Sequence, residues 1–530
     1  MSHKRLNRHQ RPICLRIIVR GILILDTPTC LGSGDAESPT DLALLRDSIS
    51  DRALLTGASI AGALRNYLRE YEHGYGSGEQ NSDCATTLFG GTRRDPDGEQ
   101  SPLIIHDAIS SKLPAVEIRD GVKINGKTGT ADEGAKYDLE LLEAGTQFPL
   151  YFELLVAKET DKDELKKALA IALRGLEKGE ISLGMKKRRG FGRCHVENWQ
   201  VREFDLRQSK DRRDWLKFNH WTRELANKKP TKKNSPQSIV AALGASNLKQ
   251  QIDQRSRLVI QAKFKLASPL LIRSSQNLTK RAAKEQNSKL SVAEVVHLRS
   301  QRNGKPQPIV SGTSLAGILW HRAERILNTL GKDLKIIDDL FGKVDEEKKV
   351  AQASRLVIEE SEIENTEDLV QNRIAIDRFT GGAYHGALFS EQPIFGMETA
   401  EKGKKSKKGN KKSQPSPKPK HLELKLELRQ PKEHEIGLLL LLLKDLWTGD
   451  LPVGGTSSIG RGRLQGVEAT ITWQQRGRGD AGTRRKEITA KNSLTQSAQT
   501  WVISQNNGKL EFAGEDKQKL EDFVSSFADK

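Results

Sequence analysis

The stretch that decides the fold is Gly184-Met-Lys-Lys-Arg-Arg-Gly-Phe-Gly-Arg193, which holds three glycines, five cations and one aromatic residue in ten positions. Glycine permits positive φ angles and a close approach of the backbone to a ligand. The cations suit a polyanion, and Phe191 is placed to stack on a nucleic acid base. The stretch therefore indicates an RNA-binding loop, with a tight solvated turn as the alternative.

A second loop, Gly454-Gly-Thr-Ser-Ser-Ile-Gly-Arg-Gly-Arg463, repeats this spacing. Four of its residues match the first loop at a single offset of 270: Gly454, Gly460, Gly462 and Arg463. Two upstream motifs also recur. Gly312-Thr-Ser314-Leu-Ala-Gly317 matches Gly57-Ala-Ser59-Ile-Ala-Gly62, and Leu340-Phe-Gly342 matches Leu88-Phe-Gly90. Motifs that recur in the same order predict a duplicated domain.

The order of apolar runs predicts the fold of each copy. In the first copy we expect strands over 13–25, 103–107, 148–157 and 196–201, one helix opened by Ser59, and a second over 164–177. The order β-α-β-β-α-β is typical of a ferredoxin-like domain. We predict an α+β protein with two tandem ferredoxin-like (RRM-like) domains at 1–206 and 256–473, joined by a basic connector at 207–255. A disordered lysine-rich insertion at 400–421 and a loosely attached polar tail at 474–530 complete the chain.

Composition narrows the class of partner. The 530-residue chain carries a net charge of +18 and has a pI near 9.5, which favours nucleic acid, with an anionic membrane surface as the rival interpretation. No apolar run of 18 residues exists, so we expect no membrane span, and no signal peptide precedes the first strand. The four cysteines form no CxxC pair, so we expect reduced thiols in a cytoplasmic protein without structural zinc.

The two Gly-x-Ser motifs predict helix starts. The free N–H groups of such a start form a seat for phosphate. A simple N-cap by Ser59 is an equally good interpretation. Arg65 lies off the apolar stripe of the first helix and so faces away from its core.

Together with Ile376-Asp-Arg-Phe-Thr-Gly-Gly382, these motifs resemble the RAMP superfamily, specifically the backbone subunits of type III CRISPR effector complexes. Two such domains in one chain resemble the double-backbone subunit of a type III-D variant. The resemblance implies that each copy holds a guide RNA with its glycine-rich loop and helix start. A β-hairpin thumb, at 122–135 and 374–387, is then expected to wedge into the guide–target duplex.

The partners that the resemblance implies are a CRISPR guide RNA, a target RNA and other subunits of the complex. Base pairing would read the target sequence, while the protein senses the shape of the duplex. The residues that we expect to bind RNA are Ser59, Arg65, Lys186, Lys187, Arg188, Arg189, Gly190, Phe191, Gly192, Arg193, Ser314, Arg378, Gly460, Arg461, Gly462 and Arg463.

The resemblance also implies a catalytic loop, because type III backbone subunits cut target RNA with a loop aspartate and a divalent metal. The spacing to Arg46-Asp47 and to Gly57 places this aspartate, and the Mg²⁺ or Mn²⁺ ligand, on Asp41. Asp35 and Asp47 are alternatives in the same loop. The second copy has no aspartate between 274 and 312, so Glu294 is its nearest candidate, and we expect that site to be inactive or weak.

Four functions remain open from the sequence. The first is a guide-RNA-binding subunit that also cuts target RNA, and the second is a scaffold of the same complex that does not cut. The third is a stand-alone RAMP endoribonuclease that processes guide RNA. The fourth is a basic RNA chaperone, which would bind any single strand with a steep salt dependence. Two tandem RNA cradles argue against a processing enzyme, which needs one site.

Overall fold

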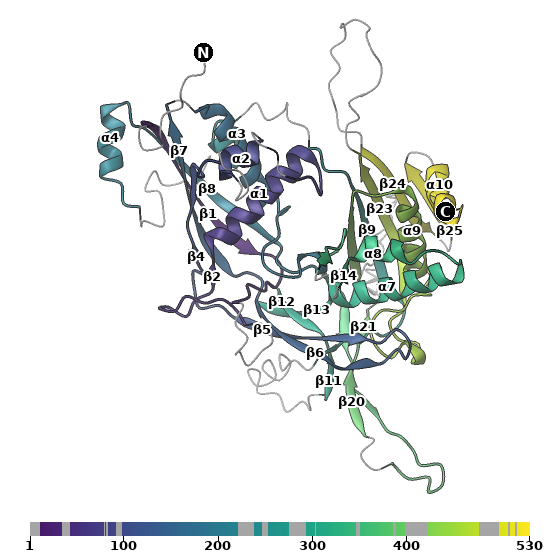
Figure 1. Ribbon diagram of the computed structural model, residues 1–530. Helices are drawn as coiled ribbons and strands as arrows, with labels where there is room; N and C mark the ends of the chain where they lie inside the picture. The colour runs from purple at the N-terminus through teal and green to yellow at the C-terminus, as the bar shows by residue number, and fades with distance from the viewer. Residues whose placement is uncertain are drawn as a thin grey trace, which may run out of the picture.

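The computed structural model describes residues 11–529, except for 34–42, 79, 81–82, 92–97, 159, 221–237, 246–252, 275–292, 303, 346–349, 385–387, 398–420, 476–497, 507–508 and 515–516. Asp35, Asp41 and nearly all of the lysine-rich insertion lie outside the described residues. Figure 1 shows two α+β units side by side, with the C-terminus in the second.

The first unit has the predicted ferredoxin-like topology. Its antiparallel sheet has the strand order β3-β7-β1-β8, and α1 and α3 pack on one face of it. In β1 alternate side chains join the core beneath these helices, namely Leu15, Ile17, Val19, Leu23 and Leu25. The elements are β1 (Ile13–Leu25), β2 (Leu54–Leu55), α1 (Gly57–His73), α2 (Cys84–Phe89), β3 (Leu103–Ile105), β4 (Ala108–Ile109), β5 (Val116–Ile124), β6 (Ala131–Leu142), β7 (Gln147–Ala157), α3 (Lys162–Glu177), η2 (Lys187–Arg189) and β8 (Cys194–Asp205).

The second unit repeats this arrangement. The order β16-β22-β9-β23 of its sheet is equivalent to β3-β7-β1-β8, and two strands extend the sheet beyond β23. The elements are β9 (Arg257–Leu266), β10 (Arg273–Ser274), β11 (Val295–His297), β12 (Arg299–Arg302), β13 (Lys305–Val310), α7 (Gly312–Thr329), α8 (Lys335–Phe341), β14 (Lys343–Asp345), β15 (Val350–Gln352), β16 (Leu356–Ile358), β17 (Ser361–Glu362), β18 (Thr366–Asp368), β19 (Gln371–Arg373), β20 (Phe389–Gln392), β21 (Ile394–Gly396), β22 (Leu422–Arg429), α9 (Glu433–Trp447), η4 (Ser457–Ile459), β23 (Leu464–Gln474), β24 (Ala498–Asn506), β25 (Lys509–Gly514) and α10 (Lys517–Asp529).

The prediction of a loosely attached C-terminal tail is wrong. β24 pairs with β23, and β25 pairs with β24, so both belong to the second sheet. α10 packs on α9, where a Cβ on Gly437 would collide with the backbone carbonyl of Phe523. Trp501, Phe523 and Phe527 are each at most 2% exposed. A few large apolar side chains in a polar segment are therefore enough to fix it on the core.

The connector is partly built into the first domain. It forms α4 (Ser209–Leu216) and the short α5 (Ile239–Ala242), and Ile239 is buried in the core of the first domain. Arg255, 3% exposed, donates to Asp253 and to Glu180, which ties the end of the connector to the turn after α3.

Both predicted thumbs are present as hairpins. In the first domain β5 and β6 pair from Val116–Leu142, at the base, to Ile124–Ala131, next to a turn at 125–130. In the second domain β19 pairs with β20, and an isolated bridge joins Ile376 to Ala383 nearer the tip. This hairpin projects away from the body of the molecule, at the bottom of Figure 1.

Candidate nucleic-acid interface

The two glycine-rich loops have the same backbone conformation. Each opens on a glycine with positive φ, continues through a non-glycine residue in the left-handed region (Lys186 at 52°, Thr456 at 58°) and makes one short 3-10 turn. A glycine with positive φ then ends that turn, Gly190 at 87° and Gly460 at 85°. The predicted correspondence at an offset of 270 is therefore a structural repeat.

The outer glycines of each loop approach the protein rather than a ligand. A Cβ on Gly184 would collide with the carbonyl oxygen of Cys30, and one on Gly454 would lie 2.6 Å from that of Leu271. Gly192 meets the carbonyl of Leu183 in the same way. These glycines are required by the fold of the loop itself, which corrects the expectation that Gly192 and Gly462 open the backbone to RNA.

The first loop docks on the second domain. A Cβ on Gly190 would collide with the backbone nitrogen of Glu360, at the end of β16. On the facing side, a Cβ on Gly312 would collide with the carbonyl oxygen of Arg189. Arg193 adds an ion pair with Glu359. The equivalent Gly460 of the second loop has open space around its Cβ position, so that loop has no such neighbour among the described residues.

Phe191 does not face solvent and cannot stack on a base. It is 2% exposed and forms a small core with Cys30, Leu139 and Leu141. The guanidinium of Arg119 lies 5.3 Å from the centre of its ring. Phe191 therefore anchors the loop to the base of the first thumb. The predicted stacking of Phe191 on a base is wrong.

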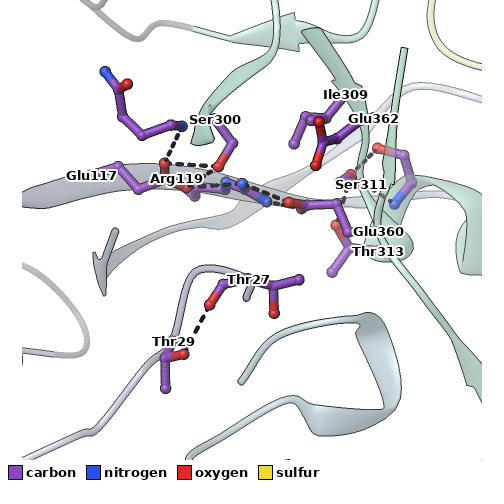
Figure 2. Close-up of polar contacts among 12 residues, drawn as sticks. Thr27, Thr29, Glu117, Arg119, Ser300, Ile309, Ser311, Thr313, Glu360 and Glu362 are labelled. Carbon is purple, nitrogen blue, oxygen red and sulfur yellow. Dashed lines mark hydrogen bonds and ion pairs between the residues drawn. The ribbon is translucent and has the colours of Figure 1, made fainter. Parts of the chain in front are cut away.

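A buried ionic network joins the first thumb to the second domain (Figure 2). Arg119 on β5 lies 2.8 Å from Glu117 and reaches Glu360 across the junction, and Glu117 accepts from the hydroxyl of Ser300 at 3.0 Å. The side chains of Glu117, Arg119 and Glu360 are each at most 4% exposed. Arg302 adds a second cation to Glu360. Although burial works to raise the pKa of Glu360, Arg119 and Arg302 outweigh it and keep the pKa lowered.

The cations of the first loop differ in their surroundings. The ammonium of Lys186 lies 3.8 Å from the centre of the Tyr137 ring, and Arg189 donates to the carbonyl of Phe341. Burial lowers the pKa of Arg189. Lys187 and Arg188 have no ion-pair partner among the residues that the structure describes. Of the five cations of the loop, Arg193 is the one that has an ion pair in the described part of the chain.

The second loop keeps one cation exposed and buries the other. Arg461 is 5% exposed and is held by Glu391 at 2.7 Å and by the side-chain oxygen of Gln371 at 2.7 Å. Arg461 therefore joins β19 and β20 at the base of the second thumb. The predicted contact of Arg461 with RNA is wrong, because its guanidinium is buried and already paired. Arg463 is exposed, beside the exposed Gly460.

The helix starts favour capping over phosphate binding. The N-cap of α1 is Thr56, whose side-chain oxygen accepts from the backbone N–H of Ser59, so Ser59 is the third residue of the helix and not its cap. Asp107 accepts from the N–H of Gly57 at 2.7 Å. In α7, Ser311 caps Ser314 in the same way. Because side chains already satisfy these N–H groups, a phosphate has less to bind here than we had expected.

Two further arginines on the list lie in different settings. Arg65 donates to the carbonyl oxygen of Gly90 at 2.9 Å and so joins α1 to the end of α2. Arg378 is exposed in the turn of the second thumb, next to Phe379, which is fully exposed. An exposed cation beside an exposed aromatic residue fits a nucleic acid surface.

The acid that lies within the described part of the catalytic loop has a structural role. Asp47 accepts from the backbone N–H and the hydroxyl of Ser50, and these hydrogen bonds lower its pKa. The carboxylate of Glu140 accepts hydrogen bonds from the backbone N–H of Leu44 and from the guanidinium of Arg46. These described carboxylates do not converge on a cation site, and the position of Asp41 is not described.

Glu294, the candidate catalytic acid of the second domain, also belongs to no group of possible metal ligands among the described residues. Glu294 is exposed, and its backbone N–H donates to Ser390. His297 is buried between the N–H of Ile272 and the carbonyl of Ile309, and burial lowers its pKa to about 3. Elsewhere in the described chain, one group of three possible metal ligands exists, at the junction of α1 and α2: Glu72, His73 and Asp83.

Two cavities of opposite charge lie on either side of the Arg193–Glu359 pair, at the junction of the domains. One, of about 360 Å³, is lined by seven cations and three carboxylates. The other, of about 510 Å³, is lined by six carboxylates and three cations. Two of the seven cations, Lys187 and Arg193, are among the predicted RNA-binding residues. The sequence did not predict the other five, because they come from separate segments that the docking of the domains brings together: Lys178, Arg255, Arg257, Lys425 and Arg429.

Comparison with known protein families assigns the chain to a family. A model of the RAMP superfamily matches residues 23–195 and 263–465, once in each ferredoxin-like domain and over more than half of the chain. The protein therefore belongs to the RAMP superfamily, which implies a CRISPR-associated protein that binds RNA. No curated protein matches the sequence. In the described part of the chain, no helix is both long and apolar enough to cross a bilayer.

Proposed function

We propose that this chain is a guide-RNA-binding backbone subunit of a type III CRISPR interference complex, which holds the guide–target duplex together with neighbouring subunits. The observation that carries the proposal is the docking of the first domain on the second. Arg189 and Gly190 of the first loop meet Gly312 and Glu360 of the second domain head to tail. A heterologous contact of this kind repeats the same surfaces along a line, as an elongated RNA requires.

The free ends of the repeat support the same function. Gly460 of the second loop is exposed, and no residue that the structure describes covers it as the second domain covers Gly190. The helix start at Gly57, equivalent to Gly312, lies against the described residues Ile105 to Asp107 of its own domain and not against a glycine-rich loop. The loop of the second domain and the helix start of the first domain each match one half of the contact between the two domains. Adjacent backbone subunits could therefore use these two surfaces to bind one another.

The thumbs supply surfaces for a duplex. Phe379 is fully exposed at the turn of the second thumb, where Ile376 is 65% exposed and Tyr384 is 61% exposed. Exposed apolar side chains are costly in water and can be inserted between base steps, as other nucleic-acid-binding proteins do. The exposed Arg378 would contact the phosphates on either side of such a wedge.

We further propose that the first domain cuts target RNA, with Asp41 as the acid and Mg²⁺ or Mn²⁺ as the cation. This part rests on the position of Asp41 relative to Arg46-Asp47 and Gly57 in the sequence. The described carboxylates of the loop do not form a metal site by themselves, so any metal would depend on Asp41.

The test is cleavage of a labelled target RNA by the assembled complex in Mg²⁺, with wild type, Asp41→Ala and Asp47→Ala compared. We expect Asp41→Ala to remove one cut while guide and target binding persist, and Asp47→Ala to keep that cut, because Asp47 caps a turn with Ser50. If the cuts are the same in all three proteins, the chain is a scaffold and another subunit cuts. A Glu294→Gln variant asks the same question of the second domain.

A further inference from the structure

Three side chains that can bind a metal ion meet where α1 ends and α2 begins. Glu72 and His73 are the last two residues of α1, and Asp83 is the residue before α2. One ligand atom from each lies within 4.8 Å of the others. The group includes none of the residues assigned to the loops, the thumbs or the proposed catalysis, so the proposed function leaves it unexplained.

The spacing of the three ligand atoms suits a shared ion better than hydrogen bonds. The Nε2 atom of His73 lies 3.5 Å from a carboxylate oxygen of Asp83 and 3.7 Å from one of Glu72. A charge-assisted hydrogen bond would bring such atoms to about 2.7–2.9 Å. Two bonds of about 2.1 Å to a tetrahedral zinc ion instead place their ligand atoms about 3.4 Å apart. The observed distances are therefore close to those of ligands around one ion.

The imidazole nitrogen that faces the two carboxylates lacks a hydrogen bond. Nε2 of His73 is buried and has no hydrogen-bond partner among the residues that the structure describes. The side chain of Asp83 beside it is 2% exposed. A buried polar atom without a partner is unfavourable. A cation bound by the lone pair of this nitrogen would remove that cost.

Backbone N–H groups hold both carboxylates in place. The Oδ1 atom of Asp83 accepts from the N–H of Thr86 at 2.6 Å, and its Oδ2 atom accepts from the N–H of Gln80 at 3.4 Å. Glu72 accepts from the N–H of Cys84 at 3.0 Å. Partners of this kind fix the orientation of metal ligands. Asp83 therefore caps α2 through one oxygen and presents the other to the group.

The second domain shows that the fold does not require these three residues. Its helices α7 and α8 repeat α1 and α2. When the motifs at the helix starts and at Leu-Phe-Gly are aligned, the positions equivalent to the three ligands hold Leu327, Asn328 and Lys335. The same junction therefore forms there without the histidine and the two carboxylates, so the group is an addition that is specific to the first domain.

We propose that Glu72, His73 and Asp83 bind one divalent transition-metal ion, with zinc as the best match. Imidazole nitrogen and carboxylate oxygen are ordinary zinc ligands, whereas Mg²⁺ and Ca²⁺ prefer oxygen ligands alone. A water molecule would complete the tetrahedron. None of the three ligands is a cysteine, so the cysteine pattern that argued against structural zinc does not bear on this site.

The proposed catalytic metal would be a different ion. Asp41, its expected ligand, precedes α1 in the sequence. The new site is at the other end of that helix, about 24 Å from Gly57 for a helix of 17 residues. The two ions can therefore be tested separately.

A bound ion would fix the turn by which the first domain touches the second. This turn starts directly after His73, with Gly74 and Tyr75. The carbonyl of Tyr75 accepts a hydrogen bond from the side chain of Gln430, and the guanidinium of Arg429 lies 4.6 Å from the centre of its ring. An ion that binds the folded chain and not the unfolded chain stabilises the folded state. We therefore expect the ion to strengthen this part of the junction.

The test is equilibrium dialysis of the full-length chain, stripped with EDTA, against Zn²⁺, with bound zinc measured by inductively coupled plasma mass spectrometry. The variants are His73→Gln and Asp83→Asn, of which the second keeps an N-cap residue for α2. The matched control is His106→Gln, which removes an exposed histidine outside the group. We expect the wild type and the control to bind one ion more per chain than either variant, whose affinity should fall about 100-fold or more.

Urea unfolding with and without Zn²⁺ gives a second readout. Zinc should raise the midpoint of the wild type and of His106→Gln but not of His73→Gln, and Mg²⁺ at the same concentration should raise none of them. Asp41→Ala should bind zinc as the wild type does, because Asp41 is not one of the three ligands, so its effect on target cleavage is a separate result. If the wild type binds no zinc, or if both variants bind as much as the wild type, the proposal is wrong.

Discussion

Removal of the Arg119 guanidinium tests whether the ionic network fixes the two domains together. Arg119 is 4% exposed, and its carboxylate partners Glu117 and Glu360 are 0% and 1% exposed. In Arg119→Ala, Glu360 keeps Arg302 and Glu117 keeps the hydroxyl of Ser300. Breaking a buried pair typically costs about 3–5 kcal/mol. Because both carboxylates keep one partner, we expect the lower end, about 3 kcal/mol.

The assay is equilibrium urea unfolding of the full chain, followed by tryptophan fluorescence, with the first transition taken as the readout. Arg207→Ala is the matched control, since it removes an arginine that pairs with Asp205 but is 70% exposed. We expect an earlier midpoint for Arg119→Ala and an unchanged one for the control. Arg119→Lys should fall between them, because it keeps the charge but loses the planar fork.

Equal midpoints for Arg119→Ala and Arg207→Ala would refute this reasoning. They would mean that desolvation of the buried charges cancels their attraction, so that apolar packing alone fixes the domains. Limited proteolysis of the same proteins gives an independent readout, since separated domains would expose the connector to cleavage.

Three further outcomes follow from single residues. Gly190→Ala should destabilise the chain strongly, since its Cβ would collide with the second domain, whereas Gly460→Ala, with similar φ and open space, should cost only about 1 kcal/mol of backbone strain in the same urea assay. Phe379→Ser should weaken binding of target RNA to the guide-loaded complex without changing stability, and Ile49→Ser, at a side chain 94% exposed outside the thumbs, should change neither. As the pH falls from about 6.5, the ordinary pKa of histidine, towards about 3, stability should fall, because the unfolded chain gains a proton that buried His297 refuses. His297→Gln should flatten this pH dependence in urea titrations at successive pH values, and an unchanged slope would count against the assignment.

The sequence alone determined the local elements and the duplication. The apolar run at 13–25 is β1, and the periodicity at 164–177 gives α3, which begins two residues earlier. These succeed because a strand or helix buries one face, and its period is written in adjacent residues. The turns Leu88-Phe-Gly90 and Leu340-Phe-Gly342 both end a helix on a glycine with positive φ, at 83° and 85°. A conformation that only glycine adopts easily leaves a trace in the sequence.

Only the tertiary structure decided which residues of a motif are free. Phe191 and Arg461 have the composition of RNA-binding residues, but a small core encloses the first and Glu391 holds the second. Glu360 meets Arg119 from 241 positions away, and no local pattern marks such a pair. The fate of a loop cation depends on what packs against it, which is a property of the docked domains. Local periodicity and the repeated glycine motifs therefore predicted the fold of each domain, while long-range packing decided which charges remain for a ligand.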